Sequence, residues 1–158
     1  MQDTKVAELE RKVAAEPLNA DLRHLLAGEY AQAGDYERAG REFQEVLILN
    51  PGAHVARFQL GLLDLTRGQA GRAIAVWAPL EMLPEGSPLK SFKRGLEALI
   101  RDEFESCARL LEEGIRANTQ IPPLNDDMRR ILAKLPARKS ADGEEQRTDF
   151  SLYGPIRH

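Results

Sequence analysis

Apolar residues recur at helical spacing along most of the chain. Between Asp3 and Glu16 the side chains of Val6, Leu9 and Val13 follow one another at three- and four-residue intervals, which predicts an amphipathic helix. Similar stripes continue to Leu135 and are separated by short runs of glycine, proline and polar residues. The sequence therefore predicts an all-α protein.

The stretch from Ala20 to Pro51 recurs further along the chain. It contains small, aromatic and turn residues in a fixed order, and a shift of about 34 residues places like on like. The shift aligns Pro17 with Pro51, Leu26 with Leu60, Ala27 with Gly61 and Gly95, Gly34 with Gly68, Ala39 with Ala73 and Cys107, and Phe43 with Trp77 and Leu111. This period and this residue order resemble the tetratricopeptide repeat (TPR) family, and the chain is similar to small bacterial TPR-containing proteins.

The resemblance implies a right-handed superhelical solenoid of antiparallel helix pairs with capping helices. We expect a TPR domain over residues 3–136, followed at 137–158 by a flexible tail with an apolar segment at 149–156. The domain divides into a capping helix at 3–16, repeats at 20–53, 54–87 and 88–121, and a second capping helix at 125–135.

Local signals predict where the helices begin and end. Asn19, Asp35 and Asn125 are placed to act as N-caps, because their side-chain oxygens can accept free backbone N–H groups. Gly34 is expected to end a helix in a left-handed conformation. Pro79 lacks the N–H that a helix interior needs, so the second helix of the second repeat should kink or end early.

Three departures from the family pattern stand out. Arg23 and Arg57 occupy a position where TPR proteins usually carry a bulky hydrophobic side chain. The inter-helix turn at Arg101-Asp102-Glu103 lacks the glycine of the other two turns, and Arg94 replaces an expected leucine. The third repeat is therefore the least regular.

The charge and the candidate catalytic residues give no support for catalysis. The net charge of -3 gives no sign of nucleic acid or an anionic membrane as the main partner. The histidines, His24, His54 and His158, are not at metal-ligand spacing, and Cys107 replaces an alanine at a helix crossing, which predicts a buried thiol. We expect a non-enzymatic protein without cofactor or metal. The chain shows neither a signal peptide nor a long apolar stretch, which predicts a cytoplasmic location.

The family resemblance implies a binding groove. In TPR proteins the first helix of each repeat lines the concave wall, and the corresponding positions here are largely apolar. The predicted groove consists of His24, Phe58, Leu62, Leu65, Phe92, Lys93, Leu96 and Leu99. These residues form either a hydrophobic groove or part of the core between repeats, because a helical apolar stripe fits both interpretations. A carboxylate clamp is disfavoured, since only Lys93 among the corresponding positions is a suitable donor.

The C-terminal segment carries three further candidates. Phe150, Leu152 and Tyr153 follow a charged linker that is long enough to reach a groove on the same molecule or on a neighbour. We interpret them as anchors of a built-in ligand that shields the groove or links two copies into a homodimer. The alternative is a flexible end with incidental apolar residues.

The function that these observations favour is that of a protein-protein interaction adaptor or scaffold. Its partner would be a protein or peptide with an apolar extended or helical segment. Two alternatives remain open. One is a small TPR chaperone of a secreted client protein, similar to type III secretion chaperones, and the other is a regulatory subunit of an enzyme complex.

Overall fold

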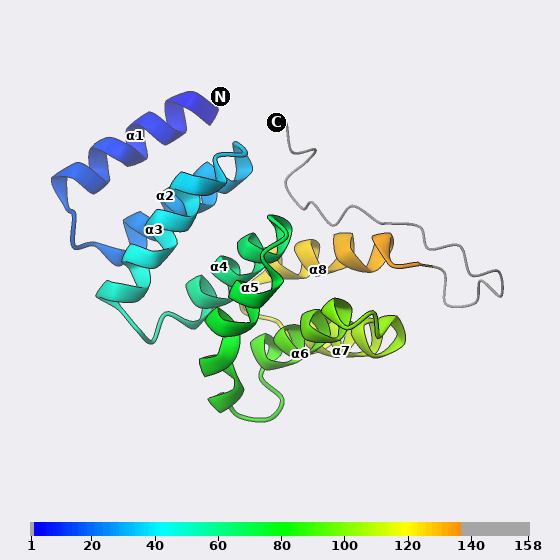
Figure 1. Cartoon of the computed structure of the whole chain (residues 1–158). Coiled ribbons are helices and arrows are strands. Elements are labelled where there is room, and N and C mark those ends of the chain that lie inside the picture. The colour runs from blue at the N-terminus through cyan, green and yellow to red at the C-terminus, as the bar shows by residue number, and fades with distance from the viewer. Residues whose placement is uncertain (1, 137–158) are drawn as a thin grey trace. The chain divides into compact units, whose positions relative to one another are not determined.

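The computed structural model describes residues 2–136, and all its regular elements in this range are helices (Figure 1). This confirms the all-α prediction. The described chain forms two compact units, at residues 2–76 and 77–136, which we describe separately. The segment 149–156 and the rest of the predicted tail lie outside the described residues.

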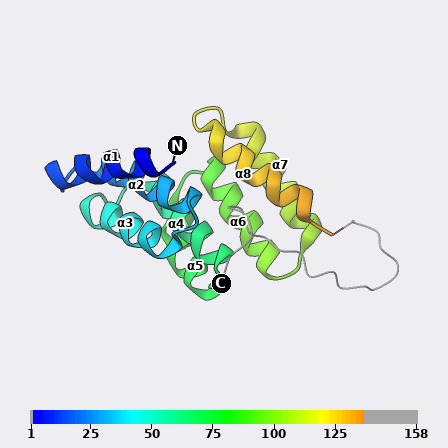
Figure 2. The same ribbon diagram turned by 90° about the horizontal axis from the view of Figure 1, so that it is seen from above.

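The first unit contains a leading helix and two helix pairs. Its elements are α1 (Gln2–Ala15), α2 (Ala20–Gln32), α3 (Tyr36–Leu49), α4 (His54–Thr66) and α5 (Ala70–Trp77), of which the last residue belongs to the second unit. Helices α2 and α3 lie side by side and antiparallel, and α1 packs against α2 (Figures 1 and 2).

The predicted N-caps of this unit are confirmed. The Asn19 side chain accepts a hydrogen bond from the backbone N–H of Leu22 at 3.2 Å, and Asp35 accepts one from Arg38 at 3.2 Å. Each satisfies a backbone donor that the first helical turn leaves free. Short polar residues thus set the starts of α2 and α3.

The same type of turn joins the two helices of three pairs in the described chain. In the first pair Gly34 N–H donates to Ala31 O and Asp35 N–H donates to Tyr30 O, a pattern typical of a left-handed helix end. Equivalent bonds occur one repeat length later around Gly68 and again around Asp102. The φ angles are +81° at Gly34, +76° at Gly68 and +60° at Asp102. The third turn therefore keeps the geometry although it lacks the glycine.

Apolar faces of α1 to α4 form the core of the first unit. Ala27 on α2 and Ala39 on α3 are completely buried, as expected for small residues where two helices cross closely. The surrounding buried side chains are larger: Leu9, Val13, Leu26, Tyr30, Phe43, Val46, Leu60 and Leu63.

Arg23 and Arg57 both donate hydrogen bonds to oxygen atoms outside their own helices. The Arg23 guanidinium donates to the Pro17 carbonyl at 2.8 Å and to Glu42 at 2.9 Å. Arg57, one repeat length later, donates to the carbonyls of Pro51 and Val76 at 3.4 and 3.3 Å. Val76 stands where the first pair has Glu42, so a backbone oxygen replaces the carboxylate as the acceptor.

The Pro79 prediction is confirmed, because α5 ends at Trp77 and a 3₁₀ helix, η1 (Ala78–Met82), follows. The second unit continues with α6 (Pro88–Ile100), α7 (Phe104–Ala117) and α8 (Pro122–Lys134). Figures 1 and 2 show α6 beside α7, and α7 packs against α8.

Two glycines allow α6 and α7 to approach closely. A Cβ atom at Gly95 would lie 2.7 Å from Leu111 Cδ2, and one at Gly114 would lie 2.5 Å from Phe92 Cε1. Cys107 is fully buried, and burial raises the pKa of its thiol to about 11. The thiol is thus a packing group, as predicted.

The start of the last helix differs from the prediction. Helix α8 begins at Pro122, and Asn125 lies inside it rather than capping it. The Asn125 amide is buried and donates to Asn118 O at 3.2 Å, while its oxygen accepts from Asn118 Nδ2 at 2.9 Å. This pair satisfies buried polar groups that join the end of α7 to α8, a tertiary role that local sequence signals do not predict.

Replacing Asp102 with glycine is expected to stabilise the protein by about 1 kcal/mol, because a left-handed conformation costs an L-residue about that much. Thermal unfolding should show a higher Tm for Asp102→Gly. The matched change in the opposite sense, Gly68→Ala, should lower the Tm. An unchanged or lower Tm for Asp102→Gly would contradict the assignment of strain to this turn.

Gly114→Ala is expected to destabilise the protein. The added methyl group would meet the buried Phe92 ring, and overpacking of this kind costs about 1–3 kcal/mol. The gain in helix propensity, about 1 kcal/mol at most, does not offset it. Gly71→Ala is the control, since a Cβ there meets no described atom within 4 Å. Chemical denaturation should separate the two variants, and equal stability would argue against the close α6–α7 contact.

Candidate protein-interaction surface

The predicted site residue His24 lies on α2 in contact with two neighbouring helices. Its Nε2 atom forms a hydrogen bond with Gln59 Oε1 on α4. Its ring meets the Phe43 ring of α3 edge-on, with the centroids 5.8 Å apart. His24 lies on the first helix of the first predicted repeat, and Gln59 lies on the first helix of the second, one residue beyond the position that corresponds to His24. The hydrogen bond places two polar side chains next to each other across α2 and α4.

Gly28 leaves open space one turn further along α2. A Cβ atom at this position would meet no described atom within 4 Å. The neighbouring Leu25 is 59% exposed. This part of α2 thus offers an accessible mixture of apolar and polar groups.

The apolar residues of the predicted groove are mostly buried. Phe58, Phe92 and Leu96 have no exposed area, and Leu62 and Leu99 retain only 1% and 6%. Leu65 is half-buried. An open hydrophobic groove requires exposed apolar surface, and these side chains offer almost none as they lie. Their burial is what the core interpretation predicts, and a binding role for them stays a prediction.

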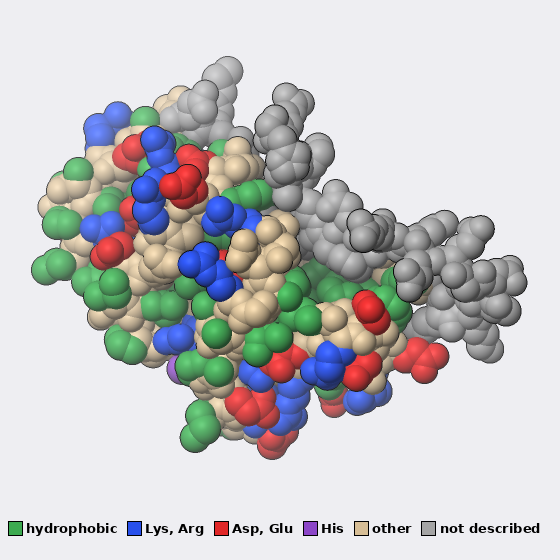
Figure 3. Space-filling view, in the orientation of Figure 1, with side chains coloured by type: hydrophobic (Ala, Val, Ile, Leu, Met, Phe, Trp, Pro, Cys, Tyr) green, Lys and Arg blue, Asp and Glu red, His purple; other side chains and the backbone are tan. Residues whose placement is uncertain are grey.

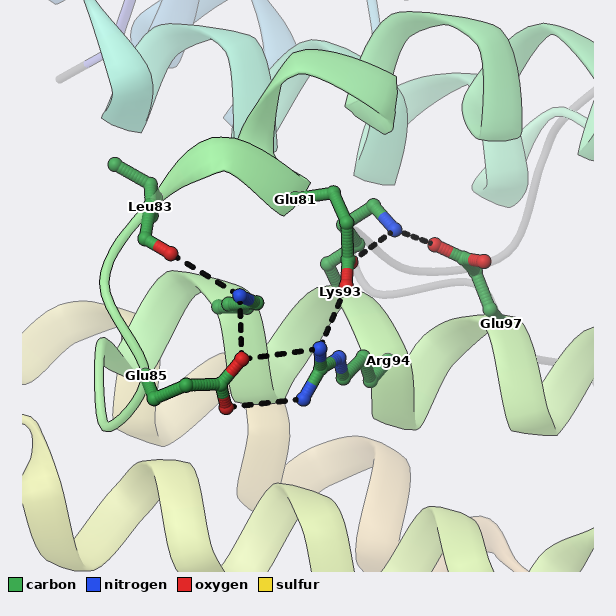
Figure 4. Close-up of polar contacts among 7 residues, drawn as sticks. Glu81, Leu83, Glu85, Lys93, Arg94 and Glu97 are labelled. Carbon is green, nitrogen blue, oxygen red and sulfur yellow. Dashed lines mark hydrogen bonds and ion pairs between the residues drawn. The ribbon is translucent and has the colours of Figure 1, made fainter.

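Lys93 is buried and held by two carboxylates. Its ammonium group lies 2.9 Å from Glu81 and 2.5 Å from Glu97 (Figure 4). Glu97 lies one turn away on the same helix, whereas Glu81 comes from η1. The lysine that the sequence offered as a carboxylate-binding group is therefore already paired within its own chain.

Lys93 belongs to a larger set of ion pairs, which we call the η1–α6 network, that joins α6 to η1 and to the segment between them. Arg94 contacts Glu81 at 2.6 Å and Glu85 at 3.3 Å, and Lys90 donates to Leu83 O at 3.1 Å and contacts Glu85 at 2.7 Å (Figure 4). Two lysines and one arginine of α6 thus hold the preceding segment. Arg94 therefore has two carboxylate partners at the position where the repeat pattern expects a hydrophobic contact.

The network shifts the protonation of its members. Hydrogen bonds from Arg94 and Lys93 lower the pKa of Glu81 from 4.5 to about 2. Burial acts against the charged form of Lys93, but its contacts with Glu97 and Glu81 outweigh burial and raise the pKa of Lys93. Glu81 and Lys93 therefore remain charged at neutral pH.

A hollow of about 490 Å³ lies along the crease between α2 and α3. Its walls are formed by Arg23, Tyr30, Arg38, Arg41, Glu42 and Glu45. The Arg38 guanidinium lies 5.9 Å from the centre of the Tyr30 ring, within the range of a cation–π contact. Figure 3 shows charged side chains of both signs beside one another over the part of the molecule formed by α1 to α3.

The described residues include some of the predicted site residues and show two features that the sequence analysis did not predict. The tail anchors Phe150, Leu152 and Tyr153 lie outside the described residues. Sequence reasoning missed the η1–α6 network and the charged hollow. The Lys93–Glu97 spacing was a visible signal, but the contact between Lys93 and Glu81 depends on the fold.

Within residues 2–136, no group of three or more histidine, cysteine, aspartate or glutamate side chains is arranged to hold a metal ion. No helix in that range is long and apolar enough to cross a membrane.

Comparison with known proteins gives matches in structure but not in sequence. Neither a protein-family profile nor a curated protein sequence matches the chain. A crystal structure of MamA is similar with a TM-score of 0.60 and 16% identity, over 73% of this chain and 68% of MamA. A structure described as MamA MSR-1 C2 gives a TM-score of 0.56 and 21% identity, over 73% of this chain and 67% of that one. The chain has a TPR-like helical fold. At these identities the similarity supports the fold alone.

Glu81→Gln is expected to remove part of the pH dependence of stability. A carboxyl whose pKa is lowered by folding stabilises the folded state above its unfolded pKa, near 4.5, and loses this contribution as the pH falls to about 2. The Tm difference between wild type and Glu81→Gln should be full at neutral pH and should disappear near pH 2. Glu113→Gln, at an exposed position on α7, is the control. A difference that stays constant over this range would show that Glu81 has no such coupling.

Proposed function

We propose that this protein is a non-enzymatic interaction adaptor that binds a segment of a partner protein on the first-helix face of its TPR-like fold. TPR-like folds are protein-interaction scaffolds, because their stacked helix pairs present an extended surface. The partner segment is a peptide or helix with apolar side chains.

The accessible part of α2 is the observation that carries this proposal. Gly28 leaves room for a ligand backbone, since a glycine permits an approach that any side chain would block. The His24–Gln59 pair beside it supplies hydrogen-bonding groups that can orient a bound chain, and Leu25 supplies apolar surface.

The predicted groove residues divide into two groups within this proposal. Leu65 is half-buried and keeps its predicted place beside the partner. The fully buried Phe58 stabilises α4 within the first unit, and Phe92 and Leu96 stabilise α6 within the second. Lys93 is assigned to the η1–α6 network and not to the partner.

Gly28→Arg is expected to block binding while leaving the fold intact. The added side chain enters open space in the free protein, and replacing glycine inside a helix adds about 0.5–1 kcal/mol of stability. Peptides selected from a random display library on the wild-type protein should bind Gly28→Arg at least about tenfold more weakly, which corresponds to about 1.4 kcal/mol.

Gly71→Arg is the matched control. Gly71 also lies in a helix, and a Cβ atom there would meet no described atom within 4 Å, but it belongs to α5, the second helix of its pair. Selected peptides should bind this variant as they bind wild type. If Gly28→Arg binds them equally well, or if the library yields no binder, the proposed binding face is wrong.

A further inference from the structure

Helix α3 carries a charged stripe along the edge of the hollow. Arg38, Arg41, Glu42 and Glu45 follow at the spacing i, i+3, i+4 and i+7, which places them on one side of the helix. The two arginines come first and the two glutamates last. We call these four residues the α3 stripe.

Most of the α3 stripe is accessible. The side chains of Arg38 and Arg41 are 57% and 63% exposed, and Glu45 is also exposed. Arg38 lies 3.5 Å from Asp35, and Arg41 lies 3.9 Å from Glu37, so these local contacts are loose. Exposed pairs of this kind contribute little to stability, which leaves the arginines able to take another partner.

Glu42 differs from the other three. It forms a close ion pair with Arg23 at 2.9 Å, and both side chains are more than four-fifths buried. This pair fixes the middle of the stripe against α2. The stripe is therefore anchored at its centre and open towards both ends.

We propose that a second copy of this chain docks on the α3 stripe, with the two α3 helices antiparallel. In that arrangement Arg38 of each copy faces Glu45 of the other, and Arg41 of each lies beside Glu42, which keeps its ion pair with Arg23. A sequence order of two arginines followed by two glutamates is self-complementary about a two-fold axis, which is the symmetry of most homodimers.

The charge order favours a second copy over an unrelated acidic or basic segment. An acidic peptide along the stripe would meet Glu42 and Glu45, and a basic one would meet Arg38 and Arg41. A shift of register would bring like charges together, so the pattern also specifies one alignment. Ile48 lies one turn beyond Glu45 and is 71% exposed, and the antiparallel partner would cover it.

The expected dimer is weak and sensitive to salt. Charge pairs near a surface contribute mainly to specificity and to the rate of association, and salt screens them. Sedimentation velocity over a range of protein concentrations should show a monomer–dimer equilibrium in dilute buffer. The equilibrium should shift to monomer at about 0.5 M salt, where the screening length is a few ångströms. A monomer at every concentration in low salt would overturn the proposal.

A charge exchange between two variants gives the sharper test. Arg38→Glu places two glutamates opposite each other in its own dimer, and Glu45→Arg does the same with two arginines. Each variant alone should dimerise at least about tenfold more weakly than wild type. An equimolar mixture should regain dimers, because both contacts are then between opposite charges. The double variant Arg38→Glu, Glu45→Arg should also regain them.

Controls separate this interface from other causes of the same result. Glu113→Arg makes the same change of charge on α7 and should leave the dimer unchanged. A loss of folding in a variant is not repaired by mixing, and a dimer held by the C-terminal segment persists in both single variants. Failure of the mixture to recover dimers, or dimers unaffected by the single changes, would overturn the proposal. The outcome does not depend on whether the α2 face binds a peptide.

Discussion

The close approach of paired helices is the constraint on which the rest of this structure depends. Ala27 and Ala39 have no exposed area in the first unit, and Gly95 and Gly114 leave no room for a Cβ atom in the second. A larger side chain at such a crossing forces the helices apart and loses contacts along their whole length. The short left-handed turns at Gly34, Gly68 and Asp102 also hold paired helices close together, because they reverse the chain within a few residues.

The close approach of the helices determines which side chains remain accessible to a partner. Once paired helices have buried their apolar faces, large side chains such as Phe58 and Phe92 are removed from the surface. Accessible chemistry then remains where a helix carries a small or polar residue on its outer side. Gly28 beside His24 on α2, and the α3 stripe, are both places of this kind. The two faces belong to the same helix pair, so changes at each can be compared in one protein background.

The fold was predictable from the sequence where the signal is local. The N-caps at Asn19 and Asp35, the turn at Gly34 and the end of α5 before Pro79 each depend on the backbone preference of one or two residues. The N-cap prediction for Asn125 was wrong, because its side chain forms hydrogen bonds with Asn118 in the folded protein instead of capping a helix. The groove residues could not be decided in this way. A stripe at helical spacing has the same period whether it faces a partner or the core, and only the packed structure gives its burial.

Charged residues were the least predictable, because their role depends on partners that are distant in the sequence. Lys93 has the chemistry of a carboxylate-binding residue, and it does bind carboxylates, but they are Glu81 and Glu97 of its own chain. Arg57 shows the same principle with a different acceptor, because it donates to the Val76 carbonyl where Arg23 donates to Glu42. A cation that is taken out of water needs a partner, and this fold supplies carboxylates or backbone carbonyls. Cations that are paired inside the fold are therefore poor candidates for recognition. The loosely paired Arg38 and Arg41 are better ones, because a new partner does not have to break a buried ion pair to reach them.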